Sequence, residues 1–224
     1  MHLTARGAAT KRRSVRGALI AGRGGTKAQG RQPFRERRRK KTRRGPWIAA
    51  AVAVALVALI GFSVRNSVTG ANFSMTAYQG AEALGGTTVS LADVKAHVAG
   101  TPIVLNFWGG SCPPCRAEMP GFQNVYERHA DDILMLGVDV GPFLNLGSRA
   151  SALRLLDELG ITYPTAYAVN RNPISQFQVT GLPATYFFDG NGNLLDSVPG
   201  FINERDLENR VRELIGTSAA SVVP

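Results

Sequence analysis

Cysteine and histidine are scarce in this chain of 224 residues, which has two cysteines and three histidines. Two cysteines cannot build a disulfide scaffold or a four-thiolate metal site within one chain. The two histidines beyond the first 46 residues, His97 and His129, lack ligand-like spacing to the cysteines, so we expect no metal site. Apolar residues nevertheless make up 44% of the chain, which is enough to fill a core and excludes disorder throughout.

Acidic residues are almost absent from the beginning of the chain. Residues 1–46 hold 16 of the 26 basic side chains and one acid, Glu36, whereas residues 47–224 hold 10 basic and 15 acidic side chains, a net charge of −5. The overall charge of +10 therefore comes from a tail and does not indicate a nucleic-acid-binding domain. Large apolar side chains are also rare there, so we expect residues 1–45 to be disordered.

Charge is absent from residues 47–64, WIAAAVAVALVALIGFSV. A helix of 18 residues spans roughly 27 Å, close to the thickness of the hydrocarbon core of a bilayer. We therefore expect a transmembrane anchor at residues 46–65 and a linker at 66–72. By the positive-inside rule the basic tail is cytoplasmic, where it contacts membrane lipid, and the remainder lies outside the cell membrane. The lack of a good small-x-small cleavage site favours a single-pass anchor over a cleaved signal peptide.

From residue 73 the composition is that of an ordinary globular domain, which we expect to end at residue 216 and to precede a tail at 217–224. We expect strands at residues 87–91, 102–108, 133–140, 165–169, 184–189 and 193–198. Helices are expected at residues 91–98, 113–129, 148–159 and 174–179, followed by a last helix that Asn203 caps and Gly216 ends. The helix at 148–159 is amphipathic, with Leu153, Leu156 and Leu159 on one face. This order predicts an α/β fold with a mixed sheet, helices on both faces and an antiparallel edge.

Both cysteines belong to one C-x-x-C motif, Cys112-Pro113-Pro114-Cys115, where a buried strand turns into a helix. The unpaired N–H groups at a helix start favour a thiolate, so we expect Cys112 to be exposed and to attack disulfides. Cys115 lies one turn further and is expected to be shielded and to resolve the mixed disulfide. The two prolines suit a first helical turn and stiffen it.

Other uses of this cysteine pair are less consistent with the sequence. A structural disulfide that closes so short a loop removes little chain entropy and would stabilise the domain little. Covalent haem attachment requires a histidine after the second cysteine, where this chain has Arg116. We therefore expect redox chemistry at the pair, with no cofactor beyond the redox-active disulfide itself.

Two segments resemble the TlpA/ResA-like family of membrane-tethered thiol–disulfide oxidoreductases with the thioredoxin fold. They are residues 106–120, NFWGGSCPPCRAEMP, and residues 179–189, VTGLPATYFFD, within a likeness that extends from about residue 73 to 215. The resemblance implies that Pro183 is cis and lies opposite the cysteines, which leaves the backbone of Leu182 free to pair with a bound peptide. The substrate-binding residues that we expect on this basis are Trp108, Pro113, Pro114, Leu182 and Pro183.

Departures from the family pattern leave the proton acceptor for Cys115 open. Asn106 stands where thioredoxins have a buried aspartate, and Gly141 begins the segment in which some TlpA/ResA-like proteins carry a glutamate. Asp139 and Glu118 are the candidates, although Glu118 also fits a solvated charge on the face of a helix.

The resemblance implies an enzyme that exchanges thiols and disulfides outside the cytoplasm. We expect it to reduce client proteins, for example during cytochrome c maturation, with electrons from a membrane thiol donor. The alternatives are an oxidant in the folding of secreted proteins, which would pass electrons to a membrane acceptor, a thiol peroxidase, and a metal-carrying binding module. We expect no nucleic-acid partner.

Overall fold

The computed structural model describes residues 48, 50–57, 68 and 70–220 of the chain. The expected disordered tail, more than half of the expected anchor, residues 66, 67 and 69 of the expected linker, and residues 221–224 lie outside these residues. Residues 50–57 are helical and exposed. Within the described ranges, no helix is both long and apolar enough to cross a membrane.

Seven strands form one mixed sheet in the order β2-β1-β5-β4-β3-β6-β7. Their bounds are β1 Ser74–Gln79, β2 Thr88–Ser90, β3 Ile103–Trp108, β4 Leu134–Asp139, β5 Thr165–Ala168, β6 Ala184–Phe188 and β7 Leu194–Pro199. The central strands β3, β4 and β5 are parallel, and antiparallel strands flank them on both sides. The expected mixed sheet is therefore confirmed, with an antiparallel edge on each side.

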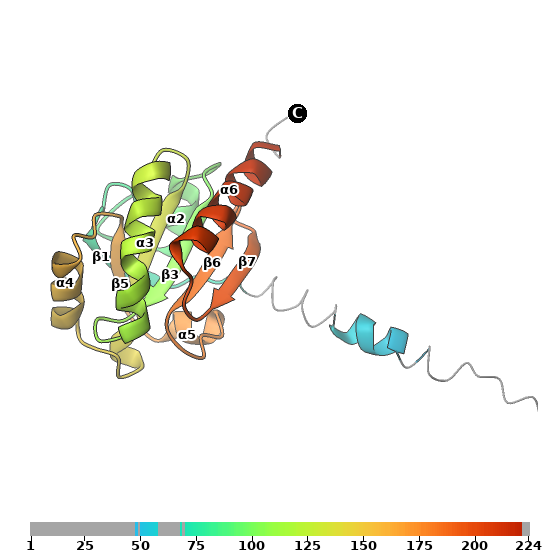
Figure 1. Ribbon diagram of the computed structural model, residues 1–224, viewed down its shortest axis with the longest axis horizontal. Helices are drawn as coiled ribbons and strands as arrows, with labels where there is room; N and C mark the ends of the chain where they lie inside the picture. Colours follow the sequence, from blue (N-terminus) through green and yellow to red (C-terminus); the bar gives the residue numbers. More distant parts are fainter. Residues whose placement is uncertain (1–47, 49, 58–67, 69, 221–224) are drawn as a thin grey trace, which may run out of the picture. The chain divides into compact units, whose positions relative to one another are not determined.

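Helices cover both faces of the sheet (Figure 1). They are α2 Leu91–His97, α3 Pro113–His129, the 3-10 helix η1 Gly141–Phe143, α4 Arg149–Glu158, α5 Asn172–Gln176 and α6 Glu204–Ala220. One buried cluster holds apolar side chains of α3, α4 and α6, such as Met119, Leu155 and Val211. The cluster on the opposite face includes Leu91 of α2 and Phe177 at the end of α5. This arrangement is a thioredoxin-like α/β fold.

The strands β3 and β4 are almost entirely apolar, with Asn106 and Asp139 as the exceptions, because both of their faces are covered. Every residue of β3 and β4 is buried. Along β3, Leu105 and Phe107 point into the cluster beneath α2, whereas Val104 and Trp108 point into the cluster beneath α3. Since the chain turns directly from the end of β3 into α3, this packing fixes where the C-x-x-C motif lies.

Four details of the sequence prediction are wrong. Strand β1 was not expected, because SMTAYQ shows no clear alternation of apolar and polar residues. Helix α5 was expected at residues 174–179, but it begins at Asn172, with Pro173 in its first turn, and Gln178, with φ 53°, follows its end. Helix α6 passes through Gly216, which is exposed and has open space around it. In α4 the side chain of Leu153 is 50% exposed, and Ala152 and its neighbours Leu155 and Leu156 form the buried face.

Candidate active site

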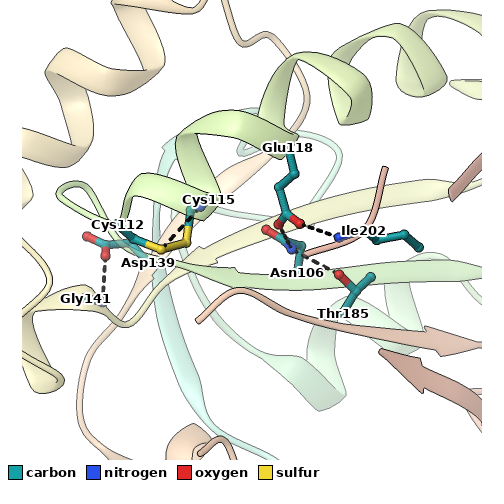
Figure 2. The surroundings of a disulfide bond; sticks show 8 residues. All are labelled: Asn106, Cys112, Cys115, Glu118, Asp139, Gly141, Thr185 and Ile202. Atoms are coloured by element: carbon teal, nitrogen blue, oxygen red, sulfur yellow. Dashed lines mark hydrogen bonds between the residues drawn. A yellow bond between two sulfur atoms is a disulfide. The ribbon is translucent and has the colours of Figure 1, made fainter. Parts of the chain in front are cut away.

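The two cysteines form a disulfide at the start of α3 (Figure 2). Their sulfur atoms are 2.07 Å apart and their Cα atoms 5.3 Å apart. Cys112 caps the helix, and its Sγ accepts a hydrogen bond of 3.3 Å from the Cys115 N–H. Pro113 and Pro114 occupy the first turn and are exposed, as expected. After reduction, the same helix start would therefore favour the thiolate of Cys112.

The expected exposure of Cys112 is wrong for this disulfide form. Cys112 is 2% exposed and Cys115 is fully buried, and both belong to the apolar cluster beneath α3. The loop before Cys112 is held against the connection between β4 and α4, because the Ser111 N–H donates to the Leu146 C=O at 2.9 Å. The exposed residues beside the disulfide are its neighbours in sequence, Ser111, Pro113, Pro114 and Arg116.

The proline loop agrees with the expectation from the sequence. The Leu182–Pro183 peptide bond is cis. Pro183 is buried and its C=O accepts a hydrogen bond from the Gly200 N–H at 2.8 Å. Leu182 is half-buried and packs against the cluster that holds both cysteines. Neither backbone group of Leu182 has a hydrogen-bond partner among the described residues, so both are available to a bound peptide.

Trp108 does not have the substrate-binding position that we expected. It is fully buried at the end of β3, and its ring lies over Gly137 of the neighbouring strand. A Cβ atom at Gly137 would lie 3.0 Å from Trp108 Nε1, so the glycine makes room for the indole. Trp108 therefore supports the site from within the core and is not accessible to a client.

Glu118 is a buried carboxyl group and not a solvated charge. It is 2% exposed and lies on α3 three residues after Cys115, on the same buried face. Its Oε1 accepts a hydrogen bond of 2.9 Å from Asn106 Nδ2, and its Oε2 accepts one of 3.1 Å from the Ile202 N–H (Figure 2). Asn106 Nδ2 also donates to Thr185 Oγ1 at 3.1 Å. Burial raises the pKa of Glu118 to about 7, although its hydrogen bonds oppose this change.

Asp139 is a second buried carboxyl group, at the end of β4. It is 1% exposed, and burial raises its pKa. Its Oδ2 accepts a hydrogen bond of 2.9 Å from the Tyr78 hydroxyl, and its Oδ1 accepts one of 2.9 Å from the Gly141 N–H. Both candidate acceptors are therefore buried carboxyl groups with raised pKa values, and Glu118 is the one that lies on the helix face of Cys115.

Several partners in this site had no clear sequence signal. Thr185 and Ile202 lie 79 and 84 residues from the side chains that they contact, and Tyr78 lies 61 residues from Asp139. A buried asparagine in an apolar strand was the one available signal, and it pointed to Asn106. The two histidines of the domain contact other groups, since His97 lies 3.1 Å from the Glu82 C=O and His129 lies 2.9 Å from Glu208. Across the described ranges, no three His, Cys, Asp or Glu side chains gather as a metal site.

A disulfide at a strand-to-helix turn, a cis-proline loop packed against the same cluster and a buried carboxyl group are the features of a thioredoxin-like thiol–disulfide oxidoreductase. Comparison with known proteins agrees. The model of a family described as the AhpC/TSA family matches residues 69–197. The chain belongs to this family, and its relatives place it in the TlpA/ResA-like group.

The similar proteins include oxidoreductases of two bacteria. Thiol-disulfide oxidoreductase ResA of Bacillus subtilis (strain 168) is 25% identical over 170 residues, which cover 73% of this chain and 90% of that protein. ResA of Geobacillus kaustophilus (strain HTA426) is 27% identical over 173 residues, which cover 73% of this chain and 92% of that protein. Among solved structures, MTB DsbF in its mixed oxidised and reduced forms matches with a TM-score of 0.51 at 25% identity, over 63% of this chain and 94% of that chain.

Proposed function

We propose that this chain reduces disulfides in extracytoplasmic client proteins, for example apocytochrome c before haem attachment, from a single-pass membrane anchor. The observation that carries the proposal is the disulfide of Cys112 and Cys115 beside a cis-proline loop with an unpaired backbone. The disulfide itself is the redox group, and the mechanism needs no further cofactor. The partners are client proteins, a membrane thiol donor that returns the pair to the dithiol form, and the lipid around the anchor.

Reduction of a client takes place in two exchanges. The Cys112 thiolate bonds to one sulfur of the client disulfide, and the second client sulfur leaves as a thiolate. Cys115 then loses its proton and attacks Cys112 Sγ, which restores the disulfide of the enzyme and releases the first client sulfur. The client gains two electrons and the enzyme loses two. We assign the proton of Cys115 to Glu118, because a buried carboxyl group with a pKa of about 7 is ionised in a large share of molecules near neutral pH.

The surroundings of Cys112 support the reducing direction. An oxidising couple requires strong stabilisation of its thiolate. The residues between the cysteines are prolines, which have no N–H group to donate, and among the described residues the Cys115 N–H is the one donor to Cys112 Sγ. Arg116, the nearest cation in sequence, is exposed and pairs with Glu158 at 2.6 Å. The thiolate of Cys112 therefore receives little help beyond the helix start.

Two measurements test the chemistry. Equilibration of the full chain with glutathione mixtures should give a potential nearer to about −270 mV than to about −120 mV. A value close to that of the strong oxidants would overturn the reducing direction. The variant Cys115→Ser should retain clients as mixed disulfides on Cys112, and mass spectrometry would identify them. The matched variant Cys112→Ser should retain none.

The location is tested separately. Protease added to intact cells should remove the domain that follows residue 66 and leave the basic tail protected. A fully protected domain would contradict the extracytoplasmic location, while the assignment of the enzyme class would be unaffected.

A further inference from the structure

Buried polar atoms that lack a protein hydrogen-bond partner are concentrated beneath α3. Within the described part of the chain there are five such side-chain atoms. Four of them are Asn106 Oδ1, Trp108 Nε1, Tyr163 Oη and Thr165 Oγ1, and none of these four residues is more than 1% exposed. Buried polar groups without a partner are rare and costly, so four in neighbouring positions indicate a shared partner.

Gly137 lies at the centre of this group. In the sheet, Asn106 of β3 and Thr165 of β5 are the direct neighbours of Gly137 on either side, so their side chains project from the same face. A Cβ atom at Gly137 would lie 3.0 Å from Trp108 Nε1 and 3.1 Å from both Tyr163 Cε2 and Thr165 Cγ2. The edges of the two aromatic rings therefore meet over the glycine, on the face of the sheet from which Asn106 projects.

Asn106 connects this group to Glu118. Its Nδ2 donates to Glu118 and to Thr185, so its Oδ1 is the end without a partner. Figure 2 shows Oδ1 turned away from Thr185 and toward the cysteines. Tyr163 lies within electrostatic range of Glu118, since burial and, to a smaller extent, the Glu118 carboxylate raise the pKa of its hydroxyl. The other partners of Glu118, the Asn106 amide and the Ile202 N–H, are uncharged.

We propose that one ordered water molecule binds between Trp108 Nε1, Tyr163 Oη and Asn106 Oδ1, and that Tyr163 is through this water a positioning residue for Glu118. The indole N–H and the phenol O–H donate to the water oxygen, and the water donates to Asn106 Oδ1. A buried water usually has two to four polar partners, and this position supplies them.

The water would fix the orientation of the Asn106 amide. With Oδ1 held by the water, the amino group of Asn106 must face Glu118. A reversed amide would place Oδ1 against the carboxylate. Hydrogen bonds in a chain polarise one another, so donation from the water to Oδ1 strengthens the bond from Nδ2 to the ionised carboxyl group. Tyr163 thus helps to keep Glu118 able to accept a proton.

A role of Tyr163 in catalysis rests on the proposed transfer of a proton from Cys115 to Glu118. The water and its hydrogen bonds to Trp108, Tyr163 and Asn106 can be tested without measuring turnover. Tyr163→Phe removes one hydroxyl and keeps the ring. Tyr126→Phe is the matched control, because Tyr126 is half-buried and its ring contacts that of Tyr163, with centroids 6.1 Å apart.

A crystal structure of the full chain at a resolution that orders waters should show a water at this position, and Tyr163→Phe should lose it. Carboxyl-carbon NMR titration should show a higher pKa of Glu118 in Tyr163→Phe and an unchanged one in Tyr126→Phe. The urea midpoint of Tyr163→Phe should fall.

The inference is overturned if the wild type has no water there, if the pKa of Glu118 is unchanged in Tyr163→Phe, or if the midpoint rises, as it would on removal of an unsatisfied hydroxyl. If the water and the shift are found but Cys115→Ser retains no client, the proposed function fails and this inference stands.

Discussion

Replacement of Glu118 by glutamine should change how the stability of the protein depends on pH. The carboxyl group is 2% exposed, and burial raises its pKa from 4.5 to about 7. The folded state therefore holds this proton up to about pH 7, whereas the unfolded state releases it near pH 4.5. Because the folded state binds more protons between these values, the free energy of unfolding falls as pH rises through this window.

The expected size of the effect follows from the two pKa values. Each pH unit between them corresponds to about 1.36 kcal/mol, so Glu118 should cost about 3 kcal/mol of stability between pH 4 and pH 8. Glutamine is uncharged like the protonated acid, but its amino group cannot accept the hydrogen bond that the Asn106 or Ile202 N–H group donates, so the substitution carries a cost that does not depend on pH. Relative to the wild type, Glu118→Gln should therefore be about 3 kcal/mol more stable at pH 8 than it is at pH 4.

Urea unfolding of the oxidised full chain at both pH values measures this difference. Comparison with the wild type removes the contributions of the other titratable groups, which are the same in both proteins. Glu213→Gln is a suitable control, because it makes the same chemical change at an exposed position on α6. If the wild type and Glu118→Gln change in parallel between pH 4 and pH 8, Glu118 does not titrate as the structure indicates.

Two further predictions concern the reactive groups. In the reduced chain, Cys112 at the helix start should be alkylated before Cys115, and equal rates at neutral pH would contradict the assignment of the nucleophile. Pro183→Thr should lower client turnover per folded molecule, because the proline loop packs against the cluster that holds both cysteines. Mixed disulfides should also persist longer in this variant, which non-reducing gels would show. A loss of stability with unchanged turnover would show that Pro183 has a structural role alone.

The sequence predicted best those strands and helices whose pattern of apolar residues lies within one continuous segment. Strands β3 and β4 were predictable because continuous apolar runs are typical of strands covered on both faces. Strand β1 was not, since it lies between β2 and β5 and is stabilised by pairing with residues up to about 90 positions away. Pairing at such separation depends on the tertiary structure, and no local pattern in SMTAYQ indicates it.

The same distinction applies to the site. The C-x-x-C motif and Pro183 were predictable from short motifs. The burial of Trp108 and Glu118 was not, because it depends on which face of β3 and α3 lies against the other. Glu118 is followed by Met119 and preceded by Ala117, so its neighbours in the sequence do not distinguish a buried from a solvated carboxyl group. Glu118 accepts a hydrogen bond from the Ile202 N–H, 84 residues away, so the segment between β7 and α6 also contributes to the site.

Gly110 should be essential to the position of the disulfide loop. A Cβ atom there would lie 2.4 Å from the backbone N of Ala152 and 2.7 Å from its Cα, so the clash is with the backbone of α4 and no side-chain rotation relieves it. Gly110→Ala must therefore displace the loop or the helix, at a cost of about 3 kcal/mol, as for severe overpacking.

Gly181→Ala is the matched control for this change, because Gly181 lies in the exposed proline loop with no atom within 4 Å of its Cβ position. Urea unfolding should show a large loss of stability for Gly110→Ala and none for Gly181→Ala. Client reduction per folded molecule should also fall in Gly110→Ala, since the loop that it displaces holds the Ser111 N–H against the Leu146 C=O immediately before Cys112. If Gly110→Ala keeps the midpoint and the turnover of the wild type, α4 does not hold the disulfide in place.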